Sequence, residues 1–291
     1  ANTLLRQNQL QEAEAIQRKI VELAPDNLNF HNALANTLLR QNQLQEAEAI
    51  QRKIVELAPD NLNFHNALAN TLLRQNQLQE AEAIQRHVLE LAPEKPNFYS
   101  GLANILLKQN RLIEAEELQR RMVELAPDNP HFYNALANTL LRQKRLEEAE
   151  EVERCAVKLK QDNPNFKIIL ASILLRQYRF EEAATLQQQA LELDSNQLNY
   201  YIELATTLTK LYKFEEAKKL IDLASVKAPN DTKISVVKDQ IDTRHTTWEV
   251  SLSKFSQIAH NNLHDIDAML SLNAVASIHI SWPWREMVLL V

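Results

Sequence analysis

The chain is poor in glycine, with one residue among 291, and has a single cysteine, Cys155. Glycine makes up about 7% of an average protein, and tight hairpins and phosphate-binding loops depend on it. Its scarcity favours helices joined by turns in which other residues adopt positive φ. A lone cysteine excludes an internal disulfide and is compatible with a reducing compartment.

Several functional classes lack their usual signals in this sequence. The formal charge is −6, from 32 basic and 38 acidic residues, so no basic excess indicates nucleic-acid binding. No apolar run approaches the ~18 residues of a membrane span, and no signal peptide is visible. No nucleophile elbow, Walker loop, dinucleotide fingerprint or paired-cysteine motif occurs. We therefore expect a protein without enzymatic activity, cofactor, nucleic-acid partner or membrane span, located in the cytoplasm.

The dominant feature that the sequence does contain is a repeat. Residues 1–26 recur letter for letter as residues 35–60, and residues 61–94 differ from residues 27–60 at four positions. The period is therefore 34 residues. Such a repeat accommodates two helices, neither of which can bury its apolar face alone, so neighbouring repeats are expected to stack.

A partial repeat over residues 1–26 and six full repeats predict a domain covering residues 1–230. In the first full repeat we expect a first helix near residues 29–41 and a second near 45–58, because apolar residues follow a helical spacing there. One small residue recurs without exception on the second helix, which predicts that two helix backbones approach closely. These positions are Ala13, Ala47, Ala81, Ala115, Ala149, Ala183 and Ala217.

The period, the apolar spacing and the ELAPD-type ending resemble the tetratricopeptide repeat family over residues 1–230. This resemblance implies an all-α fold: a right-handed α-solenoid of helix-turn-helix repeats. Segments such as NALANTLLRQNQLQEAEAI are most similar to the superhelical repeats of O-linked N-acetylglucosamine transferase-type proteins.

One departure from the family concerns its usual glycine in the turn between the two helices. Asparagine, which tolerates the left-handed conformation, stands there in the early repeats, whereas lysine or tyrosine at that place costs roughly 1–2 kcal/mol. We therefore expect the later repeats to be locally less regular or to turn differently. The positions are Asn8, Asn42, Asn76 and Asn110, then Lys144, Tyr178 and Tyr212.

The resemblance also implies a ligand groove lined by the first helices, where three ladders of polar residues recur. Asparagine offers both a donor and an acceptor, so it can hold the backbone of an extended peptide without reading its side chains. Arginine and lysine favour an acidic ligand through charge-assisted hydrogen bonds. The predicted peptide-binding residues are Asn2, Asn36, Asn70, Asn104 and Asn138; Asn32, Asn66 and Asn134; and Arg6, Arg40, Arg74, Lys108, Arg142 and Arg176.

Structural explanations of the ladders remain open. A copied repeat copies every surface residue, and the arginines can pair with glutamates of neighbouring helices. Towards the C-terminal end the groove is expected to become apolar, because isoleucine replaces asparagine at Ile168 and Ile202.

Residues 231–291 leave the repeat and contain all three tryptophans. A capping box at residues 246–249 predicts a helix that begins there and runs to about His260. We interpret the segment as a C-terminal helical cap or as the start of a truncated further domain. His260 and His264 stand four residues apart, but without a third ligand we interpret them as surface residues.

The resulting functional hypothesis is a non-catalytic protein-interaction scaffold that binds an extended peptide or partner segment in its concave groove. Two alternatives remain open. One is the substrate-recruiting arm of a larger glycosyltransferase-like enzyme, and the other is a self-assembling module that forms homo-oligomers through its repeat ends. Because Ala1 lies inside a repeat, we expect the natural N-terminus to be absent.

Overall fold

The computed structural model describes residues 2–261, with the side chains of residues 9–253, and every element in this range is an α-helix. The chain divides into two compact bodies, the N-terminal body (residues 1–177) and the C-terminal body (residues 178–291). The helices of the N-terminal body are α1 (Asn2–Leu23), α2 (Leu28–Arg40), α3 (Leu44–Leu57), α4 (Leu62–Arg74), α5 (Leu78–Leu91), α6 (Pro96–Lys108), α7 (Leu112–Leu125), α8 (Pro130–Arg142), α9 (Leu146–Leu159) and α10 (Pro164–Arg176). Those of the C-terminal body are α11 (Phe180–Leu193), α12 (Leu198–Lys210), α13 (Phe214–Lys227) and α14 (Thr232–Asn261).

The predicted helix pairs are confirmed, since α2 and α3 match the expected first and second helices to within one residue. Asn27, Asn61, Asn129 and Asn163 cap first helices by accepting a hydrogen bond from the backbone N–H two residues on. Proline soon after the second helices prevents their continuation, as at Pro59 behind the last turn of α3.

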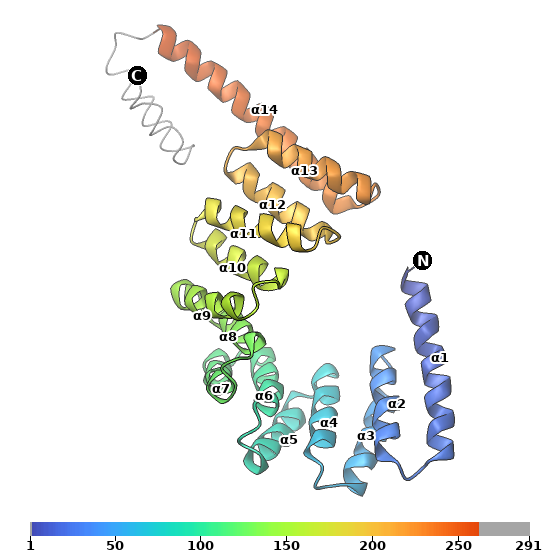
Figure 1. The fold of residues 1–291 in the computed structure, drawn as a ribbon. Helices are drawn as coiled ribbons and strands as arrows, with labels where there is room; N and C mark the ends of the chain where they lie inside the picture. The colour runs from blue at the N-terminus through green and yellow to red at the C-terminus, as the bar shows by residue number, and fades with distance from the viewer. Residues whose placement is uncertain (1, 262–291) are drawn as a thin grey trace. The chain divides into compact units, whose positions relative to one another are not determined.

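Each hydrophobic cluster is local to neighbouring helices. Leu68, Leu72 and Ala81 of one repeat pack with Ile105 of the next and Val55 of the previous one. The recurring alanines from Ala47 to Ala217 are completely buried, as their conservation in every repeat predicts. In each body a helix packs against the next one in the chain, which is the arrangement of a repeat solenoid (Figure 1).

The turns between paired helices all use one residue with positive φ, in agreement with the scarcity of glycine. Asn42, Asn76 and Asn110 have φ of 66°, 65° and 62°. The expectation that later repeats turn differently is wrong, because Lys144, Tyr178 and Tyr212 keep the same conformation, at 63°, 63° and 58°. The packing of the two helices therefore determines the turn, even where the residue is unfavourable.

Residues 2–23 have the same sequence as residues 36–57 but form one uninterrupted helix, α1. Asn8 lies inside this helix, whereas its counterpart Asn42 forms the turn between α2 and α3. Only six helical residues precede Asn8 in α1, too few to pack as a first helix of their own. This segment therefore departs from the helix-turn-helix pattern of the full repeats.

Helix α14 packs on α12 and α13 and buries Ile234 and Ile241 almost completely. Trp248 lies against Tyr212 with ring centroids 4.7 Å apart, and His245 stacks on Phe214 at 4.9 Å. The prediction of a helix that begins at a capping box near residue 246 is wrong, because Thr246 and Thr247 lie inside α14. Their hydroxyls donate to the carbonyls of Asp242 and Thr243, four residues back. His264 and the other two tryptophans, Trp282 and Trp284, fall outside the described residues.

Candidate functional site

The asparagine ladder of the N-terminal body consists of Asn36, Asn70, Asn104 and Asn138, one on each of α2, α4, α6 and α8. All four side chains are exposed, although their sequence neighbours on both sides are buried. Asn36, Asn70 and Asn104 form no side-chain hydrogen bond within the described residues, while Asn138 Nδ2 donates to the carbonyl of Asn134 at 2.9 Å. The ladder therefore presents amides that are available to a ligand.

The cationic ladder, Arg40, Arg74, Lys108 and Arg142, occupies the last residue of the same four helices and is also exposed. Lys108 Nζ donates to the carbonyl of Leu73 at 3.0 Å, and Arg142 Nη2 donates to that of Leu107 at 3.1 Å. These carbonyls belong to the last turn of the preceding first helix, where a cation also complements the helix dipole. Two of the four cations thus link neighbouring repeats, and Arg176 ends α10 in the same exposed position.

The third predicted set, Asn32, Asn66 and Asn134, is half-buried between the two helices of each repeat. Asn66 Oδ1 accepts from Gln85 Nε2 at 2.6 Å, and Asn134 Nδ2 donates to both carboxyl oxygens of Glu153, at 3.0 and 3.1 Å. These asparagines therefore contribute to packing within the repeat. Of the remaining predicted residues, Asn2 and Arg6 lie on α1, where the structure describes the backbone alone.

Sequence reasoning missed the buried polar residues on the second helices, which we call the amide column: Gln51, Gln85, Gln119 and Glu153. Two of them, Gln85 and Glu153, contact Asn66 and Asn134. Each of the four is at most 2% exposed and stands on the apolar stripe of its second helix. Gln51 Oε1 accepts from the hydroxyl of Thr71 at 2.5 Å, but its Nε2 is buried with no partner in the described structure. The available signal was the spacing Ala47, Gln51, Ile54, which places glutamine on the buried face.

Glu153 is the one acid in the amide column. Its side chain is fully buried, and burial raises its pKa to about 8, while the hydrogen bond from Asn134 acts in the opposite direction. At neutral pH the protonated form therefore prevails. A protonated carboxyl resembles the glutamine amide that other repeats carry at this position in both shape and charge.

A network of ion pairs links consecutive second helices of the N-terminal body. Arg52 of α3 bonds Glu48 of its own helix at 2.7 Å, and Glu80 of α5 through two parallel hydrogen bonds of 2.7 and 2.9 Å. Hydrogen bonds from Arg52 lower the pKa of Glu80. Arg18, Arg86 and Arg120 reach the equivalent glutamates in their own repeats and in the next.

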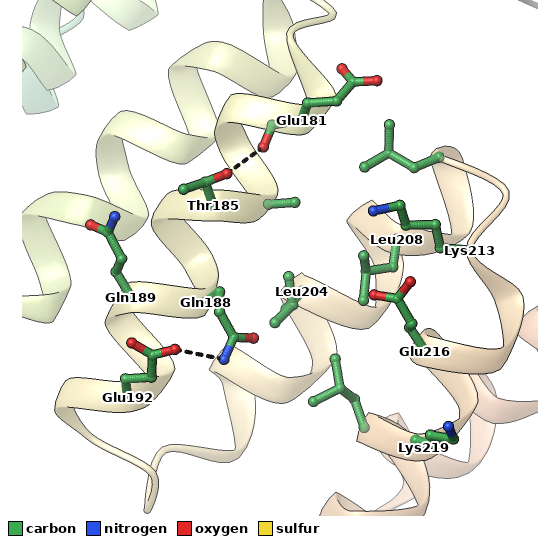
Figure 2. A pocket seen from close by; sticks show the side chains of 13 residues that line it. Glu181, Thr185, Gln188, Gln189, Glu192, Leu204, Leu208, Lys213, Glu216 and Lys219 are labelled. Atoms are coloured by element: carbon green, nitrogen blue, oxygen red, sulfur yellow. Dashed lines mark hydrogen bonds between the residues drawn. The ribbon is translucent and has the colours of Figure 1, made fainter. Parts of the chain in front are cut away.

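A pocket with a volume of about 620 Å³ lies between α11, α12 and α13 of the C-terminal body (Figure 2). Leucines of α12 and α13, among them Leu204, Leu208 and Leu220, form its apolar part. Polar and charged side chains surround it, including Gln188 from α11 and Glu216 from α13. No sequence pattern had indicated this pocket.

The described residues contain neither a group of three side chains suited to bind a metal nor a helix that is both long and apolar enough to cross a bilayer. The two polar ladders on the first helices of the N-terminal body and the pocket of the C-terminal body present polar groups to a ligand.

Comparison with protein families identifies the same kind of repeat along the chain. Three family models, each described as tetratricopeptide repeat, match residues 4–71 and 106–173, residues 66–130, and residues 169–193. Together they cover the chain from residue 4 to residue 193. No curated protein matches the sequence.

Solved structures with the same fold are distant in sequence. YrrB, described as a TPR protein with an unusual peptide-binding site, has a TM-score of 0.51 at 19% identity, over 65% of this chain and 97% of its own. PilF of Pseudomonas aeruginosa has a TM-score of 0.59 at 15% identity, over 73% of this chain and 97% of its own. Yeast Tom70 has a TM-score of 0.61 at 18% identity, over 92% of this chain and 59% of its own. The TM-scores show a shared fold, and at these sequence identities the likeness extends to the fold alone.

Proposed function

The chain belongs to the tetratricopeptide repeat family, and from this premise we propose that it is a non-catalytic scaffold that binds an extended, acidic peptide segment along the first helices. The observation that carries the proposal is the pair of exposed ladders on α2, α4, α6 and α8. Asparagine is a mediocre helix former, yet it recurs at an exposed mid-helix position where the side chains of Asn36, Asn70 and Asn104 form no hydrogen bond within the described residues.

The magnitudes favour joint use of both ladders. A neutral hydrogen bond contributes about 1 kcal/mol, so four asparagines supply roughly 4 kcal/mol. Ordering a flexible segment costs about 2–5 kcal/mol, which nearly cancels that gain. Arg40 and Arg74, whose guanidinium groups form no ion pair within the described residues, add charge-assisted bonds. An acidic peptide is therefore the ligand class that fits best.

YrrB is described as having a peptide-binding site, which makes peptide binding a reasonable expectation for this fold. The roles of Asn2, Arg6 and the half-buried asparagines in the groove remain predictions. So do the division into a repeat domain (1–230) and a C-terminal segment (231–291), the similarity to O-linked N-acetylglucosamine transferase repeats, the cytoplasmic location and self-assembly through repeat ends.

The test is a binding measurement with a fluorescein-labelled 12-residue peptide of alternating aspartate and serine, and with its uncharged asparagine-serine counterpart. The acidic peptide should bind more tightly. Changing Asn36, Asn70, Asn104 and Asn138 together to alanine should weaken binding at least tenfold while leaving stability unchanged or raised, because alanine is the better helix former.

The matched control changes Gln45 and Gln79 to alanine, since both are exposed amides on second helices, outside the ladders. It should bind the peptide as the parent does. Equal affinity of the quadruple variant and the parent would refute peptide binding by the asparagine ladder. A loss of several kcal/mol in the stability of the quadruple variant would show that these asparagines have a structural role.

A further inference from the structure

The pocket of the C-terminal body occupies the place of the ion-pair network in the earlier repeats. Its residues correspond, at three periods of 34 residues, to the network around Glu82. There Glu82 accepts hydrogen bonds from Arg86, Gln109 and Arg111, with donor–acceptor distances of 2.7 to 2.9 Å. These side chains fill the space between α5, α6 and α7.

Four substitutions change the same space in the C-terminal body. Ala184 replaces the central glutamate, Gln188 replaces the bridging arginine, Leu211 replaces the glutamine, and Lys213 replaces the second arginine. Gln188 Nε2 donates instead to Glu192 Oε1 at 3.0 Å, along its own helix (Figure 2). The changes remove both guanidinium groups and the carboxylate between them and leave leucines in the lining of a pocket of about 620 Å³.

The acceptor of the lost arginine is retained. Glu216 stands where Glu80 and Glu114 accept an arginine from the preceding second helix in the N-terminal body. Within the described residues Glu216 forms no ion pair. The site therefore keeps a carboxylate placed for a guanidinium, while glutamine, Gln188, stands at the position of the arginine that would supply it.

We propose that this pocket binds an arginine side chain presented by a peptide segment of a partner protein. Glu216 receives the guanidinium, as Glu80 receives that of Arg52 through two parallel hydrogen bonds of 2.7 and 2.9 Å. The methylene stem lies over Leu204 and Leu208, since arginine stems pack well on apolar surfaces. The volume exceeds one side chain and also accommodates an apolar neighbour of the arginine.

The geometry selects arginine over lysine, because two parallel bonds to one carboxylate need the planar guanidinium fork. Three carboxylates (Glu181, Glu192, Glu216) and two lysines (Lys213, Lys219) line the pocket. Since the lysines offset two of the carboxylates, a single arginine between apolar residues complements the pocket better than a polybasic peptide.

This site is distinct from the proposed groove. Leu204 and Leu208 precede Thr206 and Lys210, the counterparts in α12 of the asparagine and cationic ladders, by two residues each. Two residues correspond to about 200° around a helix, so the pocket and the ladder positions occupy different faces of α12. Binding here goes beyond the proposed function.

The experiment uses the full chain and the fluorescein-labelled peptide Ser-Gly-Leu-Arg-Leu-Gly-Ser, compared with the same peptide carrying citrulline, which keeps the shape of arginine but not its charge. The arginine peptide should bind at least tenfold more tightly. E216Q should abolish that preference, whereas E215Q, which changes an exposed neighbour outside the pocket, should retain it.

A second variant fills the pocket with a side chain of the protein itself. Q188R restores the arginine of the other repeats, and it should raise the melting temperature and abolish peptide binding, because the tethered side chain occupies the site. Equal binding of the two peptides, equal loss in E216Q and E215Q, or unchanged binding or a lowered melting temperature in Q188R would each overturn the proposal. The quadruple asparagine variant should bind this peptide as the parent does, so the failure of one site is distinguishable from that of the other.

Discussion

At the scale of single residues, the burial of Glu153 makes the stability of the fold depend on pH. Its pKa rises from an ordinary value near 4.5 to about 8 in the folded chain because of burial. The folded state therefore holds a proton that the unfolded state releases above pH 4.5. The stability associated with this group is fully present below pH 4.5 and is lost as pH rises through 8, by an amount on the order of 4 kcal/mol.

E153Q installs the residue of the other repeats and should remove this dependence. We expect the parent and E153Q to have similar free energies of unfolding at pH 5, and the parent to fall well below the variant at pH 9. Urea unfolding of both proteins across this pH range measures the difference in their free energies of unfolding. Other titrating groups are common to both proteins, so their contributions cancel in this difference. Parallel curves would show that Glu153 is solvated in the folded state.

The left-handed turns carry a second residue-scale prediction. Lys144 adopts a φ of 63° that asparagine tolerates better, so K144N should raise the free energy of unfolding by about 0.5–1 kcal/mol. N76K makes the reverse change in an equivalent turn at a φ of 65° and should lower it by a similar amount. Urea unfolding measures both free energies. If neither variant differed from the parent, the identity of the turn residue would not affect stability.

Residue-scale sequence reasoning succeeded where one residue carries the constraint alone. The turn positions and the buried alanine at Ala47 follow from local geometry and period. It failed where two helices share a constraint. The half-buried place of Asn66 and its hydrogen bond with Gln85 depend on the angle at which paired helices pack, which the period does not specify.

At the scale of elements, α14 completes the C-terminal body. Ending the chain after Asn230 would expose the residues that contact Ile234, Ile241 and Trp248. Since each fully buried isoleucine contributes about 1.5–3 kcal/mol, the shortened protein should melt at a lower temperature. It should also bind a hydrophobic dye more strongly.

The control for this truncation ends after Asn261, which keeps α14. It should melt at a higher temperature and bind less dye than the chain that ends at Asn230. A protein ending at Asn230 that is equally stable and free of dye would contradict the capping role of α14.

The start of α14 shows where element-level prediction from sequence reaches its limit. Residues 246–249 match a capping box, yet residues 232–245 are also compatible with helix, and helix propagation continues through a cap signal when nothing interrupts it. The helix pairs were predictable because proline and the turn asparagine interrupt the early repeats, and the 34-residue period carries the pattern into the later ones. No such residue stands between Thr232 and Asn261.

At the scale of the whole molecule, contacts between near neighbours predict modular stability. Deleting residues 61–94 removes one 34-residue period and joins two surfaces of the same design. The shorter chain should remain folded, with helical circular dichroism per residue unchanged and a lower melting temperature, because one set of neighbour contacts is lost. Global unfolding after this deletion would contradict the solenoid.

The two conformations of one sequence, α1 and the α2–α3 pair, bear on what determines the bend between paired helices. Because residues 1–23 and 35–57 are identical, their intrinsic preference for turn or helix is the same, and the surroundings decide. In the second copy, seven further residues lengthen the first helix enough to bury Leu34 against its partner. A peptide of residues 35–57 alone should therefore lack the bend at Asn42. The bend at Asn42 is therefore a property of the packed pair α2–α3 and not of its own residues alone.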